Sequence, residues 1–139
     1  MLFRSFTKHP LEVAGVEESG LDLTTAEELA TEEETENPEG VVLLCGLVEG
    51  IRGHRTRKGE RMCFAALEDL TGVVDLVYFP QTLKRYGHLL AGRGPFLVWG
   101  RPDRTGDQVN LVVEGMRPWS ELTANKLTDF KERRNILLK

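Results

Sequence analysis

A dense run of cations between residues 52 and 61 is the part of this sequence whose side chains point most directly to chemistry. Guanidinium and ammonium groups at this density bind phosphate oxygens, and a flexible loop that carries them captures a phosphate backbone without reading its sequence. The simpler alternative is a solvated basic turn that aids solubility. We expect phosphate contacts from all five cations, which are Arg52, Arg55, Arg57, Lys58 and Arg61.

Aromatic side chains could add the stacking platforms that hold unpaired bases, each worth about 1–3 kcal/mol per base. Tyr78 and Phe79 are adjacent in a strand-like run, so only one of them can face the interior of a barrel. We predict that Tyr78 is the exposed one and binds nucleic acid. Phe64 and Phe79 are predicted to be core residues.

A second candidate binding group begins at Trp99. Phe96 and Val98 alternate inward in the sequence pattern, which places Trp99 on the outer face together with Arg101. An outward tryptophan can stack on a base, anchor a protein contact, or be covered by the N-terminal segment. Secondary phosphate or base contacts are expected from three residues that flank the hairpin tip near Gly106, namely Arg101, Arg104 and Gln108.

No arrangement in the sequence is suited to catalysis or metal binding. The three histidines are scattered, and Cys45 and Cys63 lack the CxxC spacing of a metal site. The sequence has no Gly-rich phosphate loop, no nucleophile elbow and no Asp-x-Asp motif to hold the two metal ions of nucleotidyl transfer. We therefore expect no enzymatic activity, no metal and no cofactor. The two cysteines are expected to be free buried thiols in a reducing cytoplasm rather than a disulfide.

Five strand-like runs must position these residues. They cover residues 41–51, 61–68, 73–79, 96–101 and 108–115. One amphipathic helix falls between the third and fourth runs, where Leu83, Tyr86 and Leu90 form an apolar stripe. Three strands, a helix and two strands is the order of a five-stranded OB barrel, a mostly β fold with short helices. This fold binds oligonucleotides on strands two and three and on the loops joining strands 1–2 and 4–5. We expect the helix to plug one open end of the barrel.

Charge divides the chain of 139 residues into an acidic part and a basic part. Residues 1–40 hold 11 acidic and 2 basic residues, whereas residues 41–139 hold 11 acidic and 16 basic ones, within a net charge of −4. This asymmetry favours an anionic partner for the basic part. We expect an acidic N-terminal segment at 1–40, an OB domain at 41–116 and a C-terminal tail at 117–139 that forms a helix.

The acidic segment contains one predicted helix. Thr25 and Glu28 fit a capping box, and we predict a short helix from Thr25 to Glu34 with Leu29 as its apolar contact. Six glutamates between Glu27 and Glu36 favour a solvated surface. The alternative is that this acidic run mimics nucleic acid and covers the basic face of the barrel.

Several stretches of the barrel also share a pattern with a known family. They are Leu44-Cys45-Gly46-Leu47-Val48, residues 56–64, Leu67-Glu68-Asp69-Leu70-Thr71-Gly72, Val77-Tyr78-Phe79-Pro80 and Gly100, preceded by His9-Pro10-Leu11 and residues 23–29. Together they resemble the C-terminal OB domain of the alpha subunit of bacterial DNA polymerase III, over about residues 8–116. The resemblance implies contact with the single-stranded template near the polymerase. The sequence lacks that family's palm with its metal-binding aspartates, which again implies no polymerase activity in this chain alone.

These features predict a non-catalytic OB module that binds single-stranded DNA in the cytoplasm. No apolar run approaches the roughly 20 residues that cross a bilayer, and the N-terminus lacks the apolar core of a secretory signal, so we expect no membrane contact. Two other classes stay open. One is a protein-interaction module of the replication machinery, with Trp99, the acidic segment and the tail helix as its contacts. The other is an RNA or tRNA binder of the anticodon-binding type. A domain fragment, a split-gene product and a free-standing relative all fit the resemblance.

Overall fold

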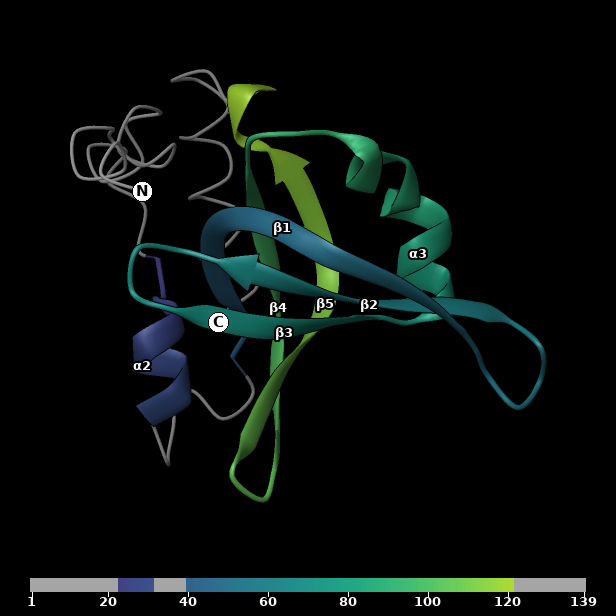
Figure 1. Cartoon of the computed structure of the whole chain (residues 1–139), viewed down its shortest axis with the longest axis horizontal. Coiled ribbons are helices and arrows are strands. Elements are labelled where there is room, and N and C mark those ends of the chain that lie inside the picture. The colour runs from purple at the N-terminus through teal and green to yellow at the C-terminus, as the bar shows by residue number, and fades with distance from the viewer. Residues whose placement is uncertain (1–22, 32–39, 122–139) are drawn as a thin grey trace, which may run out of the picture.

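The computed structural model describes residues 23–31 and 40–121, and their dominant element is a closed barrel of five strands (Figure 1). Neighbouring strands follow the order β1-β2-β3-β5-β4, with β4 pairing back onto β1. β3 and β5 pair in parallel, and the other neighbours are antiparallel. The predicted OB barrel is confirmed. Its strands are β1 (Val42–Arg55), β2 (Arg61–Glu68), β3 (Val73–Tyr78), β4 (Pro95–Thr105) and β5 (Gln108–Pro118).

Alternation along each strand separates the barrel interior from its outer face. On β2 and β3 the inward set is apolar and buried, as for Ala65 and Leu76, which lie directly opposite each other. β1 differs near its start, because Leu43 and Leu44 point to opposite faces and both are buried. This strand is therefore covered on both sides near its start.

Three strands run further than the sequence pattern predicts. β1 continues to Arg55, and β4 and β5 form a long hairpin that reaches Thr105 on one side and Gln108 on the other. The last four residues of β1 pair with residues 61–64 of β2. Backbone pairing does not depend on apolar side chains, so strand structure extends into the charged run that the sequence alone presents as a loop.

A bulge in β1 decides which of its charged residues face outward. The register with β2 shifts by one residue between Glu49 and Arg52, and Gly50 within the bulge has a φ of 64°. Such a bulge inserts one extra residue and changes the facing of every residue after it. Without the extra residue Arg52 would point into the barrel, whereas it lies opposite Phe64 on the outer face.

Short helices cover the ends of the barrel. α3 (Pro80–Tyr86) and the 3₁₀ helix η3 (Gly87–Ala91) follow β3. They pack four partly buried apolar side chains against the core, so the predicted amphipathic plug is confirmed; these are Leu83, Tyr86, Leu89 and Leu90. A second 3₁₀ helix, η4 (Trp119–Glu121), follows β5. The predicted tail helix lies beyond it, outside the described residues.

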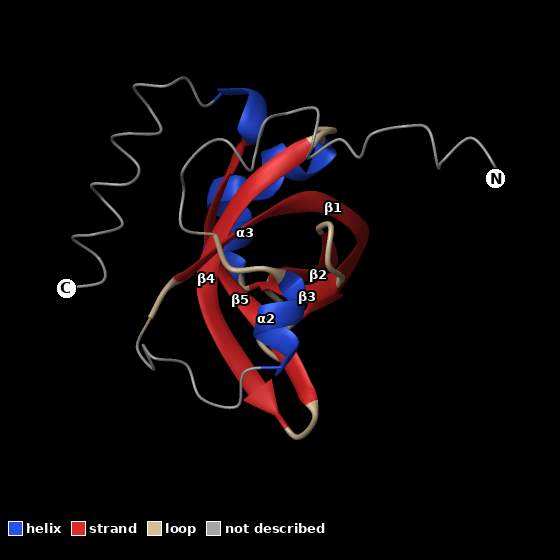
Figure 2. Cartoon of the chain, turned by 90° about the vertical axis from the view of Figure 1, so that its left-hand side faces the viewer, coloured by secondary structure: helices blue, strands red, loops and turns tan. Residues whose placement is uncertain are grey.

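The acidic segment is joined to the barrel by α2 (Ala26–Thr31), which covers the end away from α3 (Figure 2). Ala26 and Leu29 belong to the same core cluster as the inward residues of the strands, and Leu29 has no exposed surface. Leu29 is thus a core residue of the barrel. The rest of the predicted helix, residues 32–34, lies outside the described residues.

The first turn of α2 is capped partly by a distant part of the chain. The Thr25 hydroxyl accepts a hydrogen bond from the Glu28 amide at 3.1 Å, as the capping box predicts. The Asp69 carboxylate accepts from the Ala26 amide at 2.7 Å, and the Thr71 hydroxyl accepts from the Glu27 amide at 3.0 Å. Asp69 and Thr71 belong to the turn between β2 and β3, so this turn fixes α2 to the barrel.

Both cysteines are free and buried, as predicted. Cys63 belongs to the core cluster, whereas Cys45 is buried on the other face of the barrel wall. Burial raises the pKa of the Cys45 thiol from 9.0 to about 12, with a smaller contribution from Asp69, and burial also raises the pKa of the Cys63 thiol.

These shifts predict a loss of stability in alkaline solution. Above pH 9.0 the Cys45 thiol ionises in the unfolded chain but stays protonated in the folded one until about pH 12. The unfolded state therefore binds fewer protons, and the free energy of unfolding decreases as the pH rises through this range. Urea unfolding at pH 7, 9 and 10.5 measures the decrease. Cys45→Ala should show a smaller decrease than the parent protein, and an equal one would contradict the assignment to Cys45.

Candidate nucleic-acid interface

The predicted basic loop is a tight hairpin turn at the end of a long two-stranded arm. Residues 56–60 form the turn, in which the Gly59 amide donates to the Thr56 carbonyl at 2.9 Å and Gly59 has a φ of 81°. The Arg55 guanidinium donates to the Gly59 carbonyl at 3.0 Å and braces the turn from one side. The cations are thus presented on an ordered β arm, not on the flexible loop that the sequence predicts.

All five predicted cations of this arm are exposed. None of them forms an ion pair with another residue in the described part of the chain. Arg57 and Lys58 occupy the turn itself, whereas the other three lie on its two strands. An exposed cluster without internal counter-ions is the arrangement that a polyanion can neutralise. The arm cations are Arg52, Arg55, Arg57, Lys58 and Arg61.

The outer face of the arm also carries two rings. Arg52 and His54 lie on this face with Met62 and Phe64, their partners on β2. The His54 and Phe64 rings are 5.9 Å apart between centroids. Phe64 is only partly buried, so the prediction that it is a core residue is wrong. The interior positions of β2 are instead taken by the smaller Cys63 and Ala65, which are out of phase with Phe64.

The prediction that Tyr78 is exposed is wrong, and so is the prediction that Phe79 is buried. Tyr78 pairs with Cys63 on the interior face, has no exposed surface and donates its hydroxyl to the Met116 sulfur at 3.3 Å. Burial raises the pKa of the Tyr78 hydroxyl above its usual value. Phe79 is 48% exposed at the end of β3. A base cannot stack on Tyr78, so Phe79 replaces it as the candidate platform.

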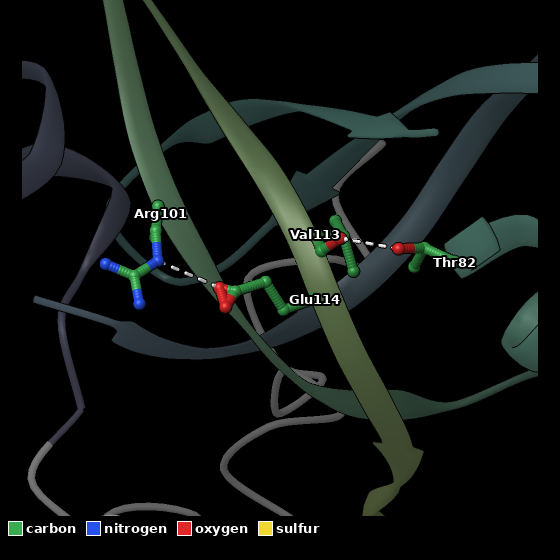
Figure 3. A network of polar contacts seen from close by, with 4 residues as sticks. All are labelled: Thr82, Arg101, Val113 and Glu114. Atoms are coloured by element: carbon green, nitrogen blue, oxygen red, sulfur yellow. Dashed lines mark hydrogen bonds and ion pairs between the residues drawn. The ribbon is translucent and has the colours of Figure 1, made fainter. Parts of the chain in front are cut away.

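Trp99 lies on the outer face, as predicted, and is half-buried there. Its ring lies over Gly115 of β5, where a Cβ would collide with it, and it meets the Tyr86 ring edge-on at 6.2 Å. Arg101 shares this face and forms an ion pair with Glu114 at 3.2 Å (Figure 3). Residues 1–22 lie outside the described part of the chain, so whether they cover Trp99 stays a prediction.

The β4–β5 hairpin presents only part of its predicted group. Arg101 and Gln108 are exposed on its outer face. Arg104 is in phase with the inward residues of β4, and one of its terminal nitrogens is buried without a hydrogen-bond partner. Arg104 is therefore not on the face of Arg101 and is only partly exposed, and its contact to phosphate or base stays a prediction. The arm and this hairpin project in different directions (Figure 1), so they do not form one cluster.

Two open hollows flank the arm where it approaches α3. One, of about 500 Å³, lies between the turn and the start of the helix, lined by Thr56, Arg57, Lys58, Glu60, Phe79, Pro80, Gln81 and Thr82. The other, of about 470 Å³, is lined by Glu60, Arg61, Leu83, Lys84, Gly87 and His88. The basic surface thus continues from the arm onto α3. Sequence reasoning missed Lys84 and His88 as neighbours of the arm, because nothing local indicates that the helix returns to it.

Within residues 23–31 and 40–121, no group of histidine, cysteine and acidic side chains is placed to hold a metal ion. No helix in the same residues is both long and apolar enough to span a membrane.

Comparison with known proteins agrees with the barrel fold. Residues 42–119 match the family model described as OB-fold nucleic acid binding domain, so the chain belongs to this family. An error-prone DNA polymerase from Symbiobacterium thermophilum is 42% identical over 64 residues, which cover 45% of this chain and 6% of that protein. The DNA polymerase III subunit alpha of Staphylococcus aureus strain Mu50 is 31% identical over 78 residues, which cover 56% of this chain and 7% of the subunit. The barrel is therefore homologous to the OB region of these polymerases, and the match spans less than a tenth of their length.

Proposed function

We propose that this chain is a non-catalytic module that binds single-stranded DNA through its basic arm. The observation that carries the proposal is the set of five exposed arm cations without ion-pair partners in the described part of the chain. They lie on the β1–β2 arm of a barrel whose family is described as nucleic-acid-binding. Proteins bind unpaired strands by combining cations that contact the phosphate backbone with aromatic side chains on which the bases stack.

DNA is the favoured nucleic acid because the related proteins are DNA polymerases. The same relation supports, as part of this proposal, a location in the cytoplasm alongside the replication machinery. The binding unit is the barrel, residues 41–116, with contacts from the arm cations, Trp99, Arg101 and Gln108. The proposal gives no catalytic role to any of the described residues.

Fluorescence anisotropy with a labelled oligo(dT) at low salt tests the proposal directly. We expect saturable binding that weakens as salt is added, because phosphate contacts release counterions. Absence of binding at about 100 µM protein, a weak limit even for nonspecific contacts, would count against the proposal. Competition with an RNA oligomer of matched sequence separates the two nucleic acids, since a contact to the 2′-hydroxyl appears as a preference for RNA. Preference for the RNA would replace the DNA assignment with the anticodon-binding type.

A further inference from the structure

Phe79 is the exposed aromatic residue of the hollow between the arm turn and the start of α3. Four large apolar side chains in the described residues are exposed, and Phe79 is the aromatic one among them; the others are Ile51, Leu70 and Val73. The exposed part of a phenyl ring stays in water, so it contributes no hydrophobic stabilisation to the folded state. Its position is instead set by β3, because Phe79 continues the outward phase of Val77 after the last paired residue.

Two arm cations line the same hollow. Arg57 and Lys58 occupy the middle of the turn, across the hollow from Pro80 and Gln81 at the start of α3. Glu60 is the acidic residue of the lining, and its backbone amide is held by the Thr56 hydroxyl at 3.2 Å. Two cations against one acid leave this hollow with a net positive charge. An exposed aromatic ring beside cations is the combination that binds a base and its phosphate together.

The size and shape of the hollow suit one nucleotide of a longer strand. Its volume of about 500 Å³ falls in the range of about 300–1,000 Å³ that small-molecule sites occupy. It is shallow and open to solvent, so a strand can enter and leave it without threading. The Thr82 hydroxyl is already engaged, because it donates a hydrogen bond to the Val113 carbonyl at 3.1 Å (Figure 3). Gln81 also lines the hollow and is the uncharged polar residue nearest to Phe79 in sequence.

We propose that this hollow is a base-stacking subsite, in which one unpaired base lies on Phe79 while Arg57 and Lys58 hold its flanking phosphates. The inference rests on the proposed binding of single-stranded DNA and adds a defined point of base contact to it. The subsite reads no sequence, because every base has a face that can stack on a phenyl ring.

The test compares oligo(dT) with an abasic oligomer of the same length and charge. Phe79→Ala is expected to weaken oligo(dT) binding about 5- to 150-fold and to leave the abasic affinity unchanged, because only the first ligand can stack. Val73→Ala, which removes an exposed apolar side chain at the start of β3, is the matched control and should change neither affinity. Phe79→Trp provides a second measurement, since quenching by oligo(dT) beyond that of the parent protein, which contains Trp99 and Trp119, and absent with the abasic strand, reports stacking on residue 79.

The outcomes separate this inference from the proposed function. If the parent protein binds oligo(dT) and Phe79→Ala binds it equally well, the subsite is overturned while DNA binding stands. If the parent protein binds neither oligomer, the proposed function itself fails. A folded Phe79→Trp variant that binds oligo(dT) with no more quenching than the parent protein also overturns the subsite. Thermal unfolding of each variant confirms the fold, with a midpoint expected within about 4 °C of the parent because both side chains are exposed.

Discussion

Replacement of Leu29 by alanine is expected to lower the free energy of unfolding by about 2–5 kcal/mol. Leu29 lies on α2, outside the five strands, yet its side chain is fully buried in the barrel core. Truncation of Leu29 leaves a cavity at the end of the barrel that α2 covers, or exposes the core there to water, because the strands cannot close further once they are fully paired. Urea unfolding followed by circular dichroism measures the change.

Leu70→Ala is the matched control for this prediction. Leu70 lies in the β2–β3 turn beside the residues that cap α2, but it is 43% exposed, so the same truncation should change the free energy by no more than about 0.5 kcal/mol. Equal small effects of the two substitutions would show that α2 does not contribute to the core in solution. Equal large effects would show that the turn, and not the buried leucine, decides stability.

The double substitution of Arg57 and Lys58 by alanine is expected to weaken oligo(dT) binding about 10- to 100-fold at 50 mM salt. Both side chains are exposed in the turn of the arm, and neither is ion-paired within the described residues. Loss of two phosphate contacts should also reduce the slope of log K against log salt concentration by about 1.4. Arg55 is left intact, because its guanidinium braces the turn and its removal would disturb the geometry.

The control for charge is the double substitution of Arg93 and Arg117 by alanine. These two arginines are exposed just before β4 and near the end of β5, and neither belongs to the arm. The change in net charge is the same, so a general attraction between a basic protein and DNA predicts equal losses. Binding through the arm predicts that the control keeps nearly all of its affinity and its salt slope. Equal losses in both variants would reject the arm as the binding element.

Local periodicity was sufficient to predict the barrel, but it predicted side-chain facing less well. The five strands and the amphipathic helix follow from apolar alternation and from turn residues, and all are present. Tyr78 was misplaced although the needed signal exists, since Tyr78 is in phase with the fully buried Leu76. The phase of a strand therefore predicts the facing of Tyr78 better than the suitability of its ring for binding does.

The remaining features depend on contacts between distant parts of the chain. Asp69 caps α2 across 43 residues of sequence, and Thr71 does so across 44, and neither pairing leaves a local pattern. The hollow beside Phe79 exists because the arm turn approaches the start of α3. The bulge at Gly50 then sets the outward facing of Arg52. Sequence reasoning therefore identified the arm cations but not the hollow that Arg57 and Lys58 help to line.

The placement of α2 has a consequence for how the molecule meets a charged partner. Glu27 and Glu28 are exposed on α2, and the arm cations lie at the other end of the longest axis (Figure 1). Within the described residues, this separation contributes an electric dipole directed along that axis. In the field of any polyanion, the resulting torque turns the arm forward before contact is made, so fewer collisions are wasted in unproductive orientations. Acidic residues fixed at the far end thus guide the approach of the basic ones.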